Sequence, residues 1–306
     1  MDTHFESIDR PAAHIAIAID PSVNELRPSR SELAWLKKCA RESHAQIQVV
    51  YISSGSGTIS SSQFAEYVTH LHLGKNVVGT VVREASSSRE RATHALLRFV
   101  KRQQINLVAV SSHGRSGMGR LVLGSFAESL LATSPVPMLF LSDGGEGAKK
   151  SNKILFPTDF SEPSKKTLRL LLKSLQRFKG EVIIYNAISI PGSILETGVT
   201  GVPIYIPENY WSDQRNWALN QIEELSKEVR DHGLVCRSVI QDNVINISSA
   251  IKKFASDEKV SMIGMASAKS NFESSVLGSV AKGVFRQRKW PVWVCGPETK
   301  YGDTTA

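Results

Sequence analysis

The sequence predicts two α/β domains, each doubly wound around a parallel five-stranded sheet with the strand order 3-2-1-4-5. Short segments rich in Val and Ile alternate with amphipathic helical segments along both halves of the 306-residue chain. These strand segments are apolar throughout, which is typical of a parallel sheet covered by helices on both faces. A domain-sized repeat is the third observation, because Ser111–Leu141 and Met265–Cys295 share one layout of strand end, loop, Gly-Ser pair, helix and last strand. Right-handed β-α-β crossovers then give the doubly wound fold.

In the first half, five apolar runs predict strands, and the amphipathic stretches between them predict helices. The expected strands are 14–19, 47–52, 77–82, 107–110 and 136–141. The expected helices are 29–43, 60–72, 88–103 and 124–134. Ser29 and Glu32 have the spacing of a capping box, in which each side chain accepts a hydrogen bond from a free N–H at the helix start. This pair supports the predicted start of the first helix.

The second half repeats this order with one addition. The expected strands are 153–158, 181–187, 235–240, 261–265 and 291–295. The expected helices are 162–178, 212–231, 245–257 and 278–287. Asp20 and Asp159 follow the first strand of each half, but the two Gly-Ser pairs are farther apart in sequence than the two aspartates. The difference predicts an insertion at 189–211, which is long enough to cover a site or a partner surface.

A Gly-rich polar stretch between the halves predicts a linker at 144–151. The first domain is then expected at 1–143 and the second at 152–300.

Composition and charge narrow the class of protein. No apolar run approaches the ~20 residues of a membrane span, and the N-terminus lacks the apolar region of a secretory signal. The three cysteines have no C-x-x-C spacing, so we interpret them as reduced core residues of a cytoplasmic protein. The net charge is +8, but the basic residues are scattered, for example Lys37-Lys38 and Lys165-Lys166. This pattern favours solvated helix faces over a specific nucleic-acid site and leaves attraction to anionic ligands open.

The candidate site lies where the winding of the first half reverses, between its first and fourth strands. Asp20 ends the first strand, and the segment from Ser111 to Gly114 ends the fourth. Ligands of such sheets bind at this crevice, outside the carboxyl ends of the strands. Gly124-Ser125 opens the next helix, where free N–H groups and the helix dipole suit phosphate oxygens. Ser125 as a simple helix cap and the glycines as simple turns are equally compatible with these residues.

The residues also resemble the universal stress protein family. Lys153–Ser164 (KILFPTDFSEPS) is similar to the opening of these domains, and Ser111–Leu141 is similar to their closing segment. Nucleotide-binding members have the pattern G-x2-G-x9-G-[ST], which here reads Ser111-x2-Gly114-x9-Gly124-Ser125. The resemblance covers nearly the whole chain as a tandem pair. It implies a Rossmann-like or flavodoxin-like α/β sandwich in each half.

The resemblance further implies ATP or another adenine nucleotide in the first half, with or without Mg²⁺. Its adenine is expected near Asp20 and Ile52, and its ribose near Ser111. Its phosphates are expected on a set of four residues: Gly114, Gly124, Ser125 and Phe126. In the second half, Met265 and Ala268 stand at the positions aligned with Ser111 and Gly114. This predicts a degraded site there, with Asp159 serving as a strand-end turn residue and helix cap.

Two functions remain open. One is a cytoplasmic stress-response binding or regulatory protein with an adenine-nucleotide site in the first half. The other is an interaction or scaffold protein in which both crevices are vestigial and the 189–211 insertion carries partner contacts. No spacing of His or Cys residues suggests a metal site, and no residue is assigned to catalysis, which leaves slow ATP hydrolysis open.

The last strands of the two halves, 136–141 and 291–295, are apolar edges, and an unpaired apolar edge promotes aggregation. Universal stress protein domains resemble one another in pairing through this strand. We therefore expect the two strands to meet antiparallel across a pseudo-twofold axis within the chain. Homodimer formation beyond this internal pairing stays open.

Overall fold

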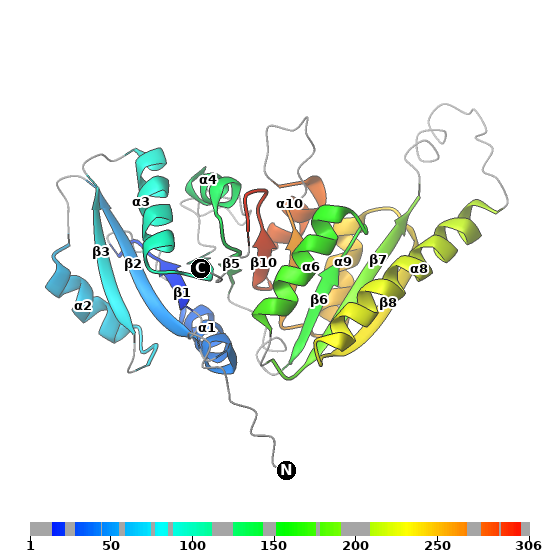
Figure 1. Ribbon diagram of the computed structural model, residues 1–306, viewed down its shortest axis with the longest axis horizontal. Coiled ribbons are helices and arrows are strands. Elements are labelled where there is room, and N and C mark those ends of the chain that lie inside the picture. Colours follow the sequence, from blue (N-terminus) through cyan, green and yellow to red (C-terminus); the bar gives the residue numbers. More distant parts are fainter. Residues whose placement is uncertain are drawn as a thin grey trace, which may run out of the picture.

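One ten-stranded sheet runs through both halves of the protein in a computed structural model (Figure 1). The structure describes residues 14–21, 28–43, 45–54, 59–74, 77–84, 88–111, 125–142, 151–175, 178–190, 209–267, 277–287 and 289–300. The strands of the first half are β1 (His14–Ala18), β2 (Gln46–Ser54), β3 (Val78–Glu84), β4 (Leu107–Ser111) and β5 (Met138–Leu141). Those of the second half are β6 (Lys153–Pro157), β7 (Glu181–Ser189), β8 (Val235–Val244), β9 (Met262–Ala266) and β10 (Val292–Cys295). Their order across the sheet is β3-β2-β1-β4-β5-β10-β9-β6-β7-β8. The predicted order 3-2-1-4-5 is therefore confirmed in each half.

Helices cover both faces of this sheet. Those of the first half are α1 (Arg30–Ser43), α2 (Ser61–His70), α3 (Arg89–Arg102) and α4 (Ser125–Thr133). Those of the second half are α6 (Glu162–Ser174), α8 (Tyr210–Asp231), α9 (Ile247–Asp257) and α10 (Ser279–Phe285). One apolar core joins α1, α2, α6 and α8 to their face of the sheet, and another joins α3, α4, α9 and α10 to the opposite face. Each core contains residues from both halves, so the two halves share the core on each face of the sheet.

The capping box predicted at the first helix is present. The Ser29 N–H donates to Glu32 Oε2 over 2.7 Å, and the Glu32 N–H donates to Ser29 Oγ over 3.2 Å. Helix α1 begins at Arg30, directly after the cap. Local hydrogen bonding thus places the helix start where the sequence pattern predicted it.

The two halves meet through β5 and β10, which pair antiparallel as predicted. Val292 lies opposite Phe140, Trp293 opposite Leu139, and Val294 opposite Met138. This register is symmetric about the Leu139–Trp293 pair, because β4 pairs Ala109 with Leu139 and β9 pairs Gly264 with Trp293. Leu139 is 1% exposed and Trp293 is 2% exposed. The apolar edges are therefore buried against one another.

The predicted insertion falls between β7 and α8. Residues 191–208, between these two elements, lie outside the described residues. Helix α8 has 22 residues where the equivalent α2 has 10. A longer helix therefore also contributes to the extra length of the second half.

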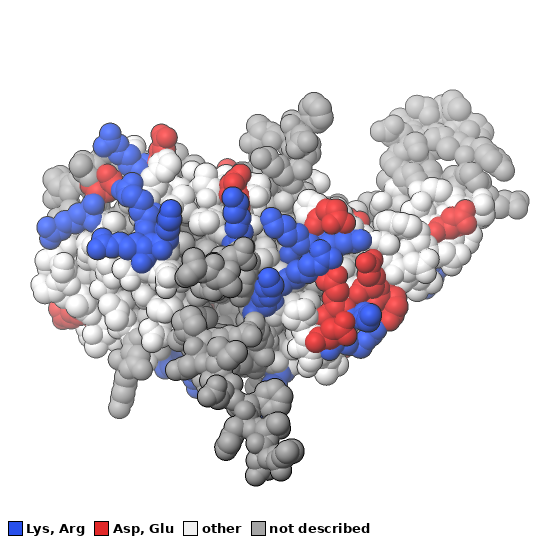
Figure 2. Space-filling model, viewed as in Figure 1, with Lys and Arg blue, Asp and Glu red and all other residues white. Residues whose placement is uncertain are grey.

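Several basic residues on the helix faces make specific contacts. The Lys165 side chain is only 13% exposed, and its ammonium lies 3.7 Å from Glu224 of α8. Arg169 pairs with Glu228 one turn further along both helices. In Figure 2 the basic side chains over α6 lie beside acidic ones toward α8. Lys38 donates to Asn152 Oδ1 over 2.7 Å and so links α1 to the start of the second half. Part of the net positive charge therefore joins helices and domains.

Candidate functional site

The candidate site is the carboxyl edge of the first half's sheet, where the winding reverses between β1 and β4. Ala18, the last residue of β1, pairs with Val110, and Ser111 follows as the last residue of β4. On the other side of β1, the Ile19 N–H donates to Val50 O of β2 over 3.0 Å. Helices α1 and α2 lie on one face here and α3 and α4 on the other. This is the switch point at which open α/β sheets bind ligands.

Four predicted site residues are described at this edge. Asp20 follows β1 and is partly buried, while Ser111 closes β4 and is also partly buried. Ile52 in β2 and Phe126 in the first turn of α4 both pack against the core on the α3–α4 face. The fold therefore brings a carboxylate, a hydroxyl and two apolar side chains to the carboxyl ends of neighbouring strands. Gly114 and Gly124 lie outside the described residues, as does the side chain of Ser125, where α4 begins.

The Ser111 hydroxyl donates to a buried carboxylate on α1. It lies 3.2 Å from Oε2 and 3.3 Å from Oε1 of Glu32, which is 0% exposed. The same carboxylate also accepts the Ser29 N–H. Hydrogen bonds to an ionised acceptor are stronger than neutral ones, and a buried carboxylate depends on them. The Ser111 side chain is thus held on the α1 face of the sheet.

Glu32 was not among the residues predicted for the site. Its spacing from Ser29 suggested a capping box, and that role was enough to account for it. The sequence nonetheless indicated that Glu32 lies near the site, since the first helix starts at the same edge of the sheet at which the first and fourth strands end. A carboxylate in that first turn has the Ser111 hydroxyl within reach.

A second hydroxyl stands near this edge without a partner. Ser53 Oγ, next to Ile52 in β2, is buried and has no hydrogen bond. Side chains alternate along a strand, so Ser53 faces the α1–α2 side of the sheet and Ile52 the opposite side. A buried hydroxyl without a partner is unfavourable unless another molecule supplies one.

In the second half, the residue equivalent to Ser111 is Ala266, and the alignment to Met265 is wrong by one position. Ile15 of β1 pairs with Leu107, whereas Ile154 of β6 pairs with Met262. The backbone agrees, because Asn106 N–H donates to His14 O and Ser261 N–H donates to Lys153 O, each over 2.8 Å. Counting along β9 from these pairs makes Met265 the equivalent of Val110.

Met265 therefore does not fill the second crevice. It is 5% exposed and belongs to the core on the α9–α10 face, as Val110 does on the α3–α4 face. Ala266 ends β9 without a hydroxyl, and the segment from Ala266 to Gly278 is one residue shorter than the segment from Ser111 to Gly124. Ala268 and Lys269, the two residues nearest to the place of Gly114, lie outside the described residues. Neither of them is a glycine, and a degraded second site stays a prediction.

The turn after β6 shows the role of Asp159. Its Oδ1 accepts the Ser161 N–H over 3.0 Å and the Ser161 hydroxyl over 2.6 Å, and it is exposed. Asp159 is thus a turn residue, as predicted, but the cap of α6 is Ser161, whose Oγ accepts the Ser164 N–H. At α10, Gly278 is the cap and Ser279 is the first helical residue. The Gly-Ser pair of the second half therefore starts its helix without a serine cap.

The described part of the chain contains no cluster of three or more metal-ligating side chains. Within the same residues, no helix combines the length and apolarity that a membrane crossing requires.

The fold defines a tandem α/β protein of the Rossmann-like class. The model of the universal stress protein family matches residues 13–142 and 150–296. The chain belongs to the universal stress protein family.

Two similar proteins illustrate the relationship. Universal stress protein MJ0577 of Methanocaldococcus jannaschii is 34% identical over 160 residues, which are 46% of this chain and 93% of that protein. A universal stress protein from Archaeoglobus fulgidus has a solved structure that superposes with a TM-score of 0.65 at 15% identity. That match covers 94% of this chain and 99% of the other. Its tandem fold is therefore shared from end to end.

Proposed function

We propose that this protein is a cytoplasmic stress-response protein that binds an adenine nucleotide, foremost ATP, in its first half. The observation that carries the proposal is the convergence of Asp20, Ile52 and Ser111 on the switch point between β1 and β4. Membership in the universal stress protein family supports it, because the chain keeps Gly114, Gly124 and Ser125 of a loop pattern that resembles that of its nucleotide-binding members, with Ser111 in place of the first glycine. The expected role is binding and regulation, and no residue is assigned a catalytic step.

The described residues fit such a ligand. Ile52 offers apolar surface for adenine, and the Asp20 carboxylate is an acceptor for its exocyclic amine. Ser111 stands where the family pattern has glycine, but its hydroxyl is held by Glu32 on the α1 face. A polar ligand at this edge thus has both apolar surface and polar partners.

The nucleotide's phosphates would be held by Gly114, Gly124, Ser125 and Phe126, with or without Mg²⁺ as their counterion. Backbone N–H groups at a loop and helix start favour anions of this kind. ATP, when bound, supplies a charged triphosphate whose presence or absence is a signal. This chain's residues orient it and exclude water from adenine.

The second half is proposed not to bind nucleotide. Ala266 lacks the hydroxyl of Ser111, and no glycine aligns with Gly114. Asp159 is engaged in the turn with Ser161, through two hydrogen bonds accepted by its Oδ1. One nucleotide per chain is the expected stoichiometry.

The alternative is an interaction protein, and one observation favours it. On α8, Trp217 is 52% exposed and Leu219 is 46% exposed, on the helix that follows the 189–211 insertion. Trp217 contacts Phe160 edge to face, with ring centroids 5.4 Å apart. Exposed large apolar side chains are frequent where proteins meet partners.

Thermal unfolding with ATP, ADP and AMP tests the nucleotide proposal. At a ligand concentration of about 100 times its Kd, binding adds about 2.7 kcal/mol to the free energy of unfolding. Asp20→Asn and Gly124→Val are expected to abolish this stabilisation, whereas the matched variants Asp159→Asn and Gly278→Val retain it. Absence of stabilisation by all three nucleotides, with no nucleotide released from the denatured protein, would favour the interaction protein.

A further inference from the structure

Helix α3 carries a row of basic side chains along its exposed face. Arg91, His94, Arg98, Lys101 and Arg102 are all exposed, and they recur at the three- and four-residue spacing that places side chains on one face of a helix. Figure 2 shows Lys and Arg side chains gathered over α3, which Figure 1 places beside the edge strand β3. We name the Arg and Lys residues of this row the α3 stripe.

The opposite face of α3 fixes the helix in the molecule. Leu96 and Val100 are at most 1% exposed, and together with Phe99 they belong to the core under α3 and α4. Because an α-helix rises ~1.5 Å per residue, the stripe from Arg91 to Arg102 is about 16 Å long. The stripe is therefore presented to solvent by a helix that is held in place on its apolar side.

Few acidic side chains offset the charge of the α3 stripe. Glu84 of β3 accepts a hydrogen bond from Arg98 over 2.8 Å, and Glu90 lies 3.9 Å from the His94 ring. Within the described part of the chain, the other three members of the stripe have no carboxylate at ion-pair distance. Most of the positive charge on this face is therefore available to a partner.

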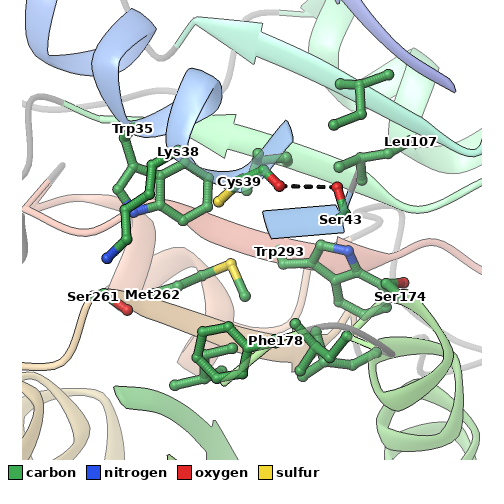
Figure 3. A pocket seen from close by; sticks show the side chains of 15 residues that line it. Trp35, Lys38, Cys39, Ser43, Leu107, Ser174, Phe178, Ser261, Met262 and Trp293 are labelled. Atoms are coloured by element: carbon green, nitrogen blue, oxygen red, sulfur yellow. Dashed lines mark hydrogen bonds between the residues drawn. The ribbon is translucent and has the colours of Figure 1, made fainter. Parts of the chain in front are cut away.

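Other basic residues on the described helices are engaged by the chain itself. On α6, Lys165 and Arg169 face carboxylates of α8. Figure 3 shows Lys38 beside Trp35 in the wall of a pocket lined by both halves. Its ammonium donates to Asn152 Oδ1 over 2.7 Å. These cations hold elements of the fold together, whereas those of the α3 stripe point into solvent.

The second half provides a comparison within the same chain. Helix α9 covers the same face of the sheet and takes the place of α3 in the repeat. Its basic residues are Lys252 and Lys253, and Lys253 donates to Asp257 over 2.7 Å. No row of basic residues follows α9, so the stripe is a property of the first half and is not required by the repeated fold.

A row of exposed cations suits a polyanion whose own charges are regularly spaced. We propose that the α3 stripe binds the phosphate backbone of a double-stranded nucleic acid. A duplex carries one negative charge per ~1.7 Å of its axis, and cations that contact its phosphates release bound counterions. Most of the stripe is Arg, whose planar guanidinium donates to two phosphate oxygens at once. Because the contacts are to phosphates, binding is independent of base sequence.

The surroundings of the stripe favour a duplex over other anionic partners. A bilayer takes up the apolar face of an amphipathic helix, but that face of α3 is buried in the core. A single strand stacks its bases on exposed aromatic side chains, and the large apolar side chains that are exposed in the described residues lie on other elements. A protein interface usually has an apolar centre, which the stripe lacks for the same reason.

The α3 stripe shares no residue with the proposed nucleotide site, so this inference does not depend on the proposed function.

Fluorescence anisotropy of a labelled DNA duplex of about 20 base pairs, titrated with the full-length protein, tests the proposal. Binding is expected at about 50 mM salt, and four phosphate contacts give log K against log salt a slope of about −3.6. A second duplex of unrelated sequence is expected to bind with the same affinity.

A matched pair of double variants locates the contact. Arg91→Gln combined with Arg102→Gln is expected to weaken binding at least about tenfold at low salt and to reduce the magnitude of the slope by about 1.8. Lys252→Gln combined with Lys253→Gln removes the same formal charge from α9 and is expected to leave affinity and slope close to those of the unmodified protein.

Three outcomes overturn the proposal. One is that the unmodified protein does not bind the duplex at about 50 mM salt. Another is that the two double variants weaken binding by the same factor, because net charge alone would then be the cause. The third uses vesicles that contain phosphatidylserine, which are expected to bind more weakly than the duplex. Equal or tighter binding of the vesicles would assign the stripe to a membrane surface. The first and third outcomes are read on the unmodified protein, and circular dichroism checks that each variant is folded.

Discussion

At the scale of single residues, an ion-pair cluster ties the amino ends of three strands to a helix end. Arg237 of β8 donates to both carboxylate oxygens of Glu258, over 3.0 Å and 2.6 Å, and to Glu181 at the start of β7 over 2.9 Å. Lys153, at the start of β6, donates to Glu258 over 3.0 Å. The hydrogen bonds from Arg237 first, and then from Lys153, lower the pKa of Glu258 to about 2. The cluster therefore favours the ionised carboxylate in the folded chain.

Glu258→Gln is expected to lower the free energy of unfolding by about 1 kcal/mol at pH 7, since the carboxylate pairs are lost. A lowered pKa contributes stability that is full above the unfolded value, 4.5, and is lost as pH falls through about 2. The difference in free energy of unfolding between wild type and Glu258→Gln is thus expected to become smaller as the pH falls from 4.5 to about 2. Urea unfolding at pH 7 and near pH 3 measures it.

Asp257→Asn is the matched control for this variant. Its partner Lys253 is 78% exposed, and exposed pairs of this kind contribute about 0.5 kcal/mol or less. A gap between wild type and Glu258→Gln that stays constant as the pH is lowered would show that charge on Glu258 is not the cause.

At the scale of elements, β5 and β10 decide how the halves are joined. All four residues of each strand are buried, and each strand has a parallel neighbour on one side and the antiparallel partner on the other. Side chains alternate between the two cores, with Leu139 in one and Met138 and Phe140 in the other. A change within either strand therefore disturbs both halves.

Leu139→Lys is expected to lower the free energy of unfolding of the whole chain by more than about 3 kcal/mol, because it buries an unpaired charge opposite Trp293. Val78→Lys is the control, since Val78 is 60% exposed on the edge strand β3. Chemical denaturation with circular dichroism gives both values. A similar small effect for the two variants would mean that the junction contributes little to stability.

The elements were predictable from sequence because apolar runs and caps are local signals. The residue-by-residue equivalence of β4 and β9 was not predictable. Strand β9 is buried on both faces, so its sequence MIGMA does not show which side chains face α6. The loop spacing counted back from Gly278 aligns Met265 with Ser111, whereas strand pairing makes Ala266 its equivalent, because the second loop is one residue shorter. The contact of Glu32 with Ser111 depends on the same long-range placement. Much of the proposed phosphate loop lies outside the described residues, so that part of the site stays a prediction.

At the scale of the whole molecule, the halves share a sheet and two cores. The core on the α1–α6 face runs from Val49 in the first half to Ile184 in the second, through Leu139 and Trp293. The core on the other face joins Phe140 to Phe285, whose rings meet edge to face at 4.9 Å. Both cores therefore cross the junction between the halves.

The full chain is therefore expected to unfold in one cooperative transition. Differential scanning calorimetry tests this, because a two-state transition has a calorimetric enthalpy equal to its van't Hoff enthalpy. Two separated transitions, or a calorimetric enthalpy well above the van't Hoff value, would show that the halves melt independently and that the junction is weak.

The pairing of β5 with β10 inside one chain also frees the two halves from symmetry. In a homodimer joined through this strand, a substitution would appear in both partners, and dilution would separate them. A covalent tether keeps the second strand at high effective concentration whatever the protein level. Each half is then able to change alone, so that Leu139 faces Trp293 across the axis and Ser111 has Ala266 as its counterpart. The pairing of the two halves is therefore unaffected by the abundance of the protein itself.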